Sequence, residues 1–320
     1  MQGRQTQNDV SNRVNVEDAD LVGSAVVGLF ASRFPGADFS KLARAFEDIK
    51  ALFNGSFPGY LACDTLYHDL RHTLDAALAT ARLIDGHERS QSPKDRLGPR
   101  RAMLGVIVAL LHDSGYMKRE SEHDVENGAI FTKIHVGRGA DFLLDYLPRL
   151  GFGAEAPLAA KLVHYTGYEI PVADLQVSDP RDHVLGCIVG TADLLSQMAD
   201  RTYVEKCRDF LYEEFVWGGI ARERLLNGRE VVNYRSPDDL VLKTPEYYDN
   251  VAKQRIGSTL GGADRYADAH FGGTNLYRIE IETTMRFLRS VIQGEQLERV
   301  RRRCYSLSAR KTASSKTASG

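Results

Sequence analysis

The sequence predicts an all-α protein. Apolar residues recur at spacings of three and four in segments 21–30, 39–53 and 276–292, which is the pattern of amphipathic helices. No alternating apolar and polar run is long enough to predict a sheet, and no repeat of fixed length is present. The segment 227–274, which contains several prolines and glycines, predicts short helices joined by loops. Further helices are predicted for residues 67–84, 101–111, 128–147, 156–164, 184–198 and 203–215.

Length and composition limit the classes of function. We expect residues 20–300 of the 320 to form one domain, between a disordered polar segment, 1–19, and a disordered basic tail, 301–320. The 41 Lys and Arg residues nearly balance the 43 Asp and Glu residues, so no net positive field favours nucleic acid. The four cysteines lack paired spacing, and no apolar stretch resembles a signal peptide or a membrane span. A cytoplasmic protein without a nucleic-acid or membrane partner is therefore expected.

The run VIVALLHDSGY is the stretch of greatest chemical interest. Its apolar residues, 106–111, predict a buried helix that ends directly in His112 and Asp113. A buried carboxylate without a partner is unfavourable, and a metal ion would satisfy both side chains. The run therefore predicts half of a metal site.

Two other predicted helices carry polar residues that could complete this site. His68 and His72 lie on neighbouring turns of one face, and Asp193 lies inside an apolar helix. Asp193 could also cap a helix or pair with an arginine. One histidine, a His-Asp pair and a buried Asp on three helices supply nitrogen and oxygen ligands without a thiolate. Such a set suits a hard or borderline divalent ion and leaves room for water or substrate.

The order of these residues resembles the H…HD…D signature of the HD-domain superfamily of metal-dependent phosphohydrolases, whose fold is an all-helical bundle. The residues that carry the resemblance are His72, His112, Asp113 and Asp193. The stretch YHDLRHT, residues 67–73, also resembles the YHNxxHA motif of the cyclic-nucleotide phosphodiesterases in that superfamily, and departs from it at Asp69 and Thr73. The resemblance covers residues 66–198, and it implies an HD-type bundle with short additional helices in the C-terminal third.

The resemblance also implies a metal centre. The four signature residues would bind a first ion, and Asp113 would bridge to a second. His135 and His164 lie between the HD pair and Asp193, each on a predicted helix, and are similar in position to the histidines that complete the second ion in binuclear branches. Two divalent ions of Mn, Mg, Zn, Ni or Fe are expected as cofactors.

Further residues are candidates for catalysis and substrate binding. By resemblance His68 is the general acid, and Asp69, Asp75 or another carboxylate would have to keep it charged. Lys118 lies where many relatives carry a basic residue, so a phosphate contact and a solvated position both remain open. Gln197 and Arg201 follow Asp193 along one helix face, where they could line the substrate pocket, cap the helix or lie on the surface.

These features predict a hydrolase that cleaves a small-molecule phosphoester with a metal-activated hydroxide and a histidine general acid. A nucleotide or cyclic nucleotide is the expected substrate. The alternative is a mixed-valent di-iron oxygenase, because some HD-fold proteins with six ligands in this order activate dioxygen. His68 favours the hydrolase, since an acid beside the metals has no obvious task in oxygen activation. A regulatory module with a degenerate site is less favoured, because no expected ligand is missing.

Overall fold

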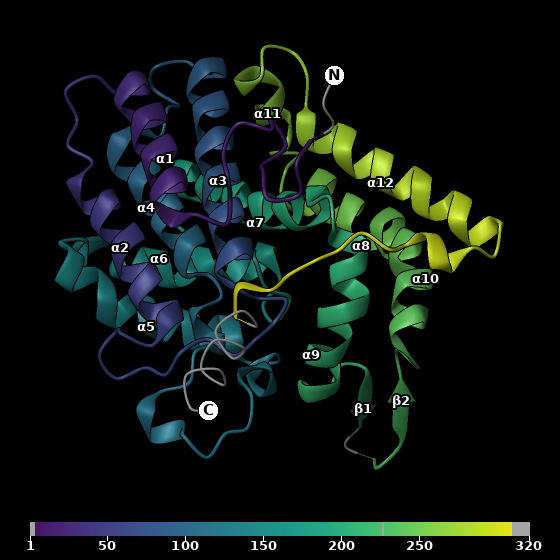
Figure 1. Cartoon of the computed structure of the whole chain (residues 1–320). Helices are drawn as coiled ribbons and strands as arrows, with labels where there is room; N and C mark the ends of the chain where they lie inside the picture. Colours follow the sequence, from purple (N-terminus) through teal and green to yellow (C-terminus); the bar gives the residue numbers. More distant parts are fainter. Residues whose placement is uncertain (1–3, 226, 309–320) are drawn as a thin grey trace, which may run out of the picture.

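A long helix, α3 (Leu70–Ser90), lies at the centre of the fold. The computed structural model describes residues 4–225 and 227–308. Helix α3 is buried along most of its length and packs against α1 (Ala19–Arg33), α4 (Gly98–Leu111), α7 (Pro180–Ala199) and α11 (Arg265–His270). The predicted all-α class is confirmed (Figure 1). The other helices and the two strands are α2 (Ser40–Asn54), α5 (His135–Leu150), α6 (Ala156–Leu162), α8 (Tyr203–Lys206), α9 (Tyr212–Trp217), α10 (Pro237–Tyr247), α12 (Leu276–Gln293), β1 (Arg222–Arg224) and β2 (Glu230–Val232).

Close packing of three helices positions the metal-ligand candidates. Helix α4 is apolar on all sides and is buried from Ala102 to Leu111, as expected for a helix inside a core. At Gly105 it approaches both neighbours, since an added Cβ would lie 2.6 Å from Leu185 of α7 and 3.2 Å from Ile84 of α3. The ligands on α3, α4 and α7 are therefore held on a rigid frame.

The first turn of α3 is fixed by its N-cap. One carboxylate oxygen of Asp69 accepts a hydrogen bond from the backbone N–H of His72 at 3.2 Å. The other oxygen accepts from the N–H of Leu307 at 2.7 Å. Asp69, where the sequence departs from the phosphodiesterase motif, thus has a capping role that orients the turn carrying His72.

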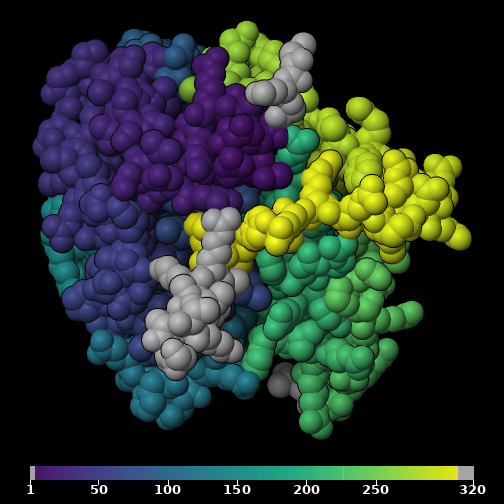
Figure 2. Space-filling model, viewed as in Figure 1, coloured from purple at the N-terminus to yellow at the C-terminus, as the bar shows by residue number. Residues whose placement is uncertain are grey.

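The N-terminal segment differs from the expectation of disorder over residues 1–19. Its described part packs on the core: Asp9 and Val16 are fully buried, and the Asp9 carboxylate lies 2.6 Å from Nη2 of Arg82. The partner arginine is 73 positions away in the chain, so local composition does not reveal it. Figure 2 shows the purple N-terminal residues packed over part of one face of the molecule.

The start of the C-terminal tail also packs on the protein. The N–H of Arg302 donates to Glu205 at 3.0 Å, and Ser306 is buried. These contacts differ from the disorder predicted for 301–320, although residues 309–320 lie outside the described part. In Figure 2 the yellow segment runs across the surface from α12 toward the N-terminal helices.

Two predicted helices are divided in the structure, and one hairpin was not predicted. The helix predicted for 128–147 is divided into the short turn η3 (Gly128–Phe131) and α5. The helix predicted for 203–215 contains a π-helical turn, η7 (Cys207–Leu211), between α8 and α9. The antiparallel hairpin β1–β2 was not predicted, because strands of three residues are too short for an alternating pattern. Among the described residues, no helix has the length and apolarity needed to cross a bilayer.

Candidate metal centre

Ligand atoms of His72 on α3 and of His112 and Asp113 at the end of α4 lie close together, and Asp193 of α7 approaches the two histidines. The Nε2 atoms of His72 and His112 lie 3.2 Å apart. Oδ2 of Asp113 lies 3.4 Å from Nε2 of His72 and 3.2 Å from Nε2 of His112. Oδ1 of Asp193 lies 3.2 Å and 3.5 Å from the same two nitrogens. All four side chains are buried or nearly so.

These distances fit a single metal ion. Ligands at about 2.1 Å from a tetrahedral ion lie about 3.4 Å from one another, which matches the spacing of the His72, His112 and Asp113 atoms and the distances from Asp193 to the two histidines. Oδ2 of Asp113 is buried and has no hydrogen-bond partner in the described part of the chain. Because an unsatisfied buried carboxylate oxygen is unfavourable, its position toward two imidazole nitrogens favours a cation between them.

The histidine rings are oriented for metal binding by their other nitrogens. Nδ1 of His112 lies 2.7 Å from the carbonyl oxygen of Ala109 and donates to it. Nδ1 of His135 donates in the same way to the carbonyl of Thr132 at 2.6 Å. A proton held at Nδ1 leaves Nε2 free as a ligand, as in most metal-binding histidines.

Electrostatics favours charged carboxylates at this point. Burial raises the pKa of Asp113, but His112 and other nearby histidines lower it well below its usual range. The pKa of Asp193 is lowered in the same way, chiefly by His112 and His72 against burial. Burial lowers the pKa of His112, whereas Asp113 and Asp193 raise it strongly. The carboxylates of Asp113 and Asp193 are therefore charged at this point.

A second metal position is less complete. Nε2 of His135 lies 3.8 Å from Oδ1 of Asp113, the oxygen that faces away from the first position. His164 lies on the short turn η5 (Val163–Tyr165), and no described contact joins it to Asp113 or His135. Burial lowers the pKa of both His135 and His164, and the carboxylate of Glu169 acts in the opposite direction on each. Glu169, which the sequence did not single out, lines the same cavity as His135.

His68 lies beside the metal position with a carboxylate partner. Its Nδ1 is 2.5 Å from Oε2 of Glu214 on α9, and Oε1 of Glu214 accepts from the N–H of Tyr67 at 2.5 Å. Burial lowers the pKa of His68, but Glu214 and Asp113 raise it, with a net rise to about 8. The carboxylate that keeps His68 charged is thus Glu214, whereas Asp69 caps α3.

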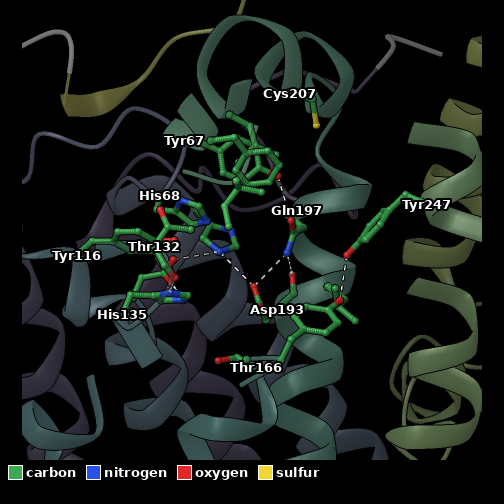
Figure 3. Close-up of a pocket in the computed structure, with 18 of the residues that line it drawn as sticks. Tyr67, His68, Tyr116, Thr132, His135, Thr166, Asp193, Gln197, Cys207 and Tyr247 are labelled. Carbon is green, nitrogen blue, oxygen red and sulfur yellow. Dashed lines mark hydrogen bonds and ion pairs between the residues drawn. The ribbon is translucent and has the colours of Figure 1, made fainter. Parts of the chain in front are cut away.

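Tyr116 is stacked between two of the predicted site residues. Its ring centroid lies 4.5 Å from that of His68 and 4.4 Å from that of His135, with interplanar angles of 19° and 18°. Tyr116 is 2% exposed, so the three rings form a fixed stack on one side of the cavity (Figure 3). Tyr116 ends the short turn η1 (Ser114–Tyr116), which sets its position relative to the HD pair.

Gly115 in the same turn allows α5 to approach, and its replacement gives the first prediction. A Cβ at Gly115 would overlap the carbonyl oxygen of His135. Gly115→Ala is expected to displace His135 and to lower the amount of metal bound per chain, as measured by elemental analysis after dialysis. Gly137→Ala, on α5 with no atom within 4 Å of the added Cβ, is the matched control. Full loading of Gly115→Ala would exclude His135 as a ligand.

The metal position opens into a cavity of about 530 Å³. His68, Tyr116 and His135 lie on one side of Asp193, and Tyr247 of α10 lies on the other (Figure 3). The volume falls in the range of small-molecule sites. The cavity therefore gives a small substrate direct access to the candidate metal ligands.

Of the three remaining predicted residues, Gln197 lies at the cavity, whereas Lys118 and Arg201 do not. Gln197 lines the cavity, where its amide donates to Asp193 at 3.3 Å and accepts from the hydroxyl of Tyr67 at 3.0 Å. Lys118 does not line it: its ammonium pairs with Asp64 at 2.6 Å and donates to a backbone carbonyl. Arg201 does not line it either, and its carbonyl accepts from Arg302. Gln197 thus orients the carboxylate of Asp193. The side chains of Lys118 and Arg201 lie outside the cavity.

Glu214 is the functional residue that the sequence analysis missed most clearly. It follows Leu211 by three positions, so it lies on the apolar face of its helix and is only 3% exposed. That spacing was an available indication that Glu214 is buried.

Comparison of the chain with models of protein families, with curated proteins and with solved structures finds no match.

Proposed function

We propose that the protein is a metal-dependent hydrolase of phosphoesters with an HD-type site. The single observation that supports this most is the cluster of His72, His112 and Asp113, with Asp193 beside the two histidines, next to a histidine that is held by a carboxylate. Metals at this site would lower the pKa of a water molecule and neutralise charge on the phosphoryl oxygens. The chain itself supplies Asp113 as a two-sided ligand, with Oδ2 toward His72 and His112 and Oδ1 toward His135.

His68 provides the proton in this proposal. Water adds to phosphorus as the bond from phosphorus to the ester oxygen breaks, and the departing alkoxide takes a proton from His68. The products are an alcohol and a phosphate with one ester bond fewer. Glu214 holds His68 in its charged form and fixes the direction of its ring, while Tyr116 stacks on its face.

The di-iron oxygenase remains the second candidate, and one observation separates the two. A histidine with its pKa raised to about 8 is protonated at neutral pH, which serves a leaving alkoxide and has no evident task in oxygen activation. A screen of the Mn-, Mg-, Zn-, Ni- and Fe-loaded protein against simple phosphomonoesters and linear and cyclic nucleotides tests the proposal. Metal-dependent release of phosphate or monoester supports it, and release that chelation does not abolish contradicts it.

The pH dependence of turnover gives a second prediction. His68 is protonated below its pKa, which Glu214 raises, so kcat should fall as pH rises through that pKa. In Glu214→Gln the carboxylate that raises this pKa is lost and burial lowers it, so the alkaline fall in kcat should move to lower pH. The two proteins should therefore differ more at pH 8 than at pH 6. Both are compared metal-loaded, because bound cations act on the same pKa.

Glu213→Gln is the matched control for this experiment. Glu213 is the exposed neighbour of Glu214 on α9, and its replacement should leave the pH profile as in the wild type. An unchanged profile in Glu214→Gln would show that Glu214 does not set the charge of His68.

A further inference from the structure

We infer that the substrate of this site is a phosphoester of an apolar alcohol, whose organic group fills the part of the cavity that leads from Asp193 toward α10. This inference rests on the proposed hydrolase function and names its substrate class. We term this part of the cavity the apolar arm. It is defined by Leu194, Tyr203, Cys207, Phe215, Leu240 and Tyr247.

The apolar arm is built by the region after α7. The helix α8–η7–α9 supplies one wall, and the π-helical turn within it holds Cys207 at the cavity. Helix α10 supplies the opposite wall with Leu240 and Tyr247. In Figure 3, Tyr247 lies on the far side of Asp193 and Gln197 from His68 and His135, and Cys207 lies above Gln197. A substrate with its phosphoryl group at the metal ligands would therefore extend its organic group into the arm.

Several of the polar atoms on these walls already have partners within the protein. The hydroxyl of Thr244 donates to the carbonyl of Leu240 at 2.9 Å, and the hydroxyls of Tyr247 and Tyr168 lie 3.0 Å apart. The amide of Gln197 is shared between Tyr67 and Asp193. A nucleobase brings several donors and acceptors that would lose water without gaining partners here, whereas an apolar group loses none.

The charges near the arm also disfavour a polyphosphate. The two lysines among the lining residues are both paired: Lys243 with Asp239 at 3.0 Å and Lys133 with Glu223 at 2.7 Å. A second or third phosphate would bring negative charge toward these carboxylates as well. One phosphoryl group at the metal ligands and an uncharged apolar group in the arm fit this distribution better.

A series of monophosphates of primary alcohols tests the inference, because their leaving groups differ little in basicity. With the metal-loaded protein, kcat/KM should rise about fourfold per methylene from ethyl to octyl phosphate until the arm is filled. Naphthylmethyl phosphate distinguishes an aromatic from an alkyl preference. Adenosine monophosphate and cyclic adenosine monophosphate should be poorer substrates than octyl phosphate.

Two neighbouring residues on α9 provide the variant and its control. Phe215 lines the arm and stacks on Tyr234 with ring centroids 5.6 Å apart, whereas Val216 is 54% exposed. Phe215→Ser should lower the octyl-to-ethyl ratio of kcat/KM by roughly tenfold, and Val216→Ser should retain the wild-type ratio. Circular dichroism checks that both variants fold.

The outcomes separate this inference from the function on which it rests. Hydrolysis of nucleotides in preference to octyl phosphate, with no gain along the alkyl series, overturns the apolar substrate and leaves the phosphohydrolase intact. No hydrolysis of any phosphoester overturns the function, and calorimetric binding of octylphosphonate against ethylphosphonate then reports whether the arm still takes an alkyl chain. Equal binding of the two phosphonates would contradict the arm itself.

Discussion

Replacing Asp113 with alanine is expected to remove bound metal and phosphoester hydrolysis together. Oδ2 of Asp113 faces His72 and His112, and Oδ1 faces His135, so one substitution removes a ligand from both positions. The loss of metal affinity should exceed the roughly 10- to 100-fold cost of changing a residue that only supports a ligand. Elemental analysis after dialysis and the rate of phosphate release measure the two effects.

Thermal unfolding gives a readout of Asp113→Ala that does not depend on activity. A metal present at about 100 times its Kd should stabilise the wild type by about 2.7 kcal/mol, or roughly 5 °C in Tm, and chelation should remove this gain. The Tm of Asp113→Ala should not respond to metal or chelator. Asp145→Ala, at an exposed position on α5, should respond as the wild type does. Full metal loading of Asp113→Ala would contradict the bridging role.

Replacing His68 with alanine should leave the metals in place and slow turnover by roughly 10² to 10⁴. His68 lies beside the four ligand atoms but pairs with Glu214, so its removal takes away a proton donor without removing a ligand. The loss should be full for an alkyl phosphate, whose alkoxide must be protonated as it departs. It should be much smaller for p-nitrophenyl phosphate, whose phenolate departs without a proton.

This dependence on the leaving group distinguishes an acid from a structural residue. His68→Asn, which fills more of the ring's position beside Tyr116, should show the same pattern as His68→Ala. Equal losses with both substrates, with metal content unchanged, would mean that His68 only supports the packing of the site.

Much of the fold and of the first metal position follows from local sequence. The apolar run of α4 is continuous, so its burial and the position of His112 and Asp113 at its end could be predicted. Asp193 stands out because the residues on either side of it are apolar. The C-terminal end of α3 was harder to predict, because the helix continues through Gly86 to Ser90. Gly86 lets α11 pack closely, since a Cβ at this position would overlap the carbonyl oxygen of Tyr266.

The other parts of the site depend on contacts that local patterns do not contain. Glu214 belongs to an acidic pair that looks solvent-exposed, and its spacing from Leu211 indicates a buried face but does not reveal its partner. Its contact with His68 joins positions 146 residues apart in the chain. The packing of the N-terminal segment could not be predicted for the same reason. The burial of Asp9 depends on Arg82 of α3, which is distant in the chain.

One measurement tests the central proposal most directly: phosphate release and dissolved oxygen recorded together during turnover of octyl phosphate by the metal-loaded protein. We predict metal-dependent phosphate release with no oxygen consumed, and ¹⁸O from labelled water in the phosphate. Oxygen uptake in proportion to product, obtained only with iron, would contradict the hydrolase and favour the di-iron oxygenase.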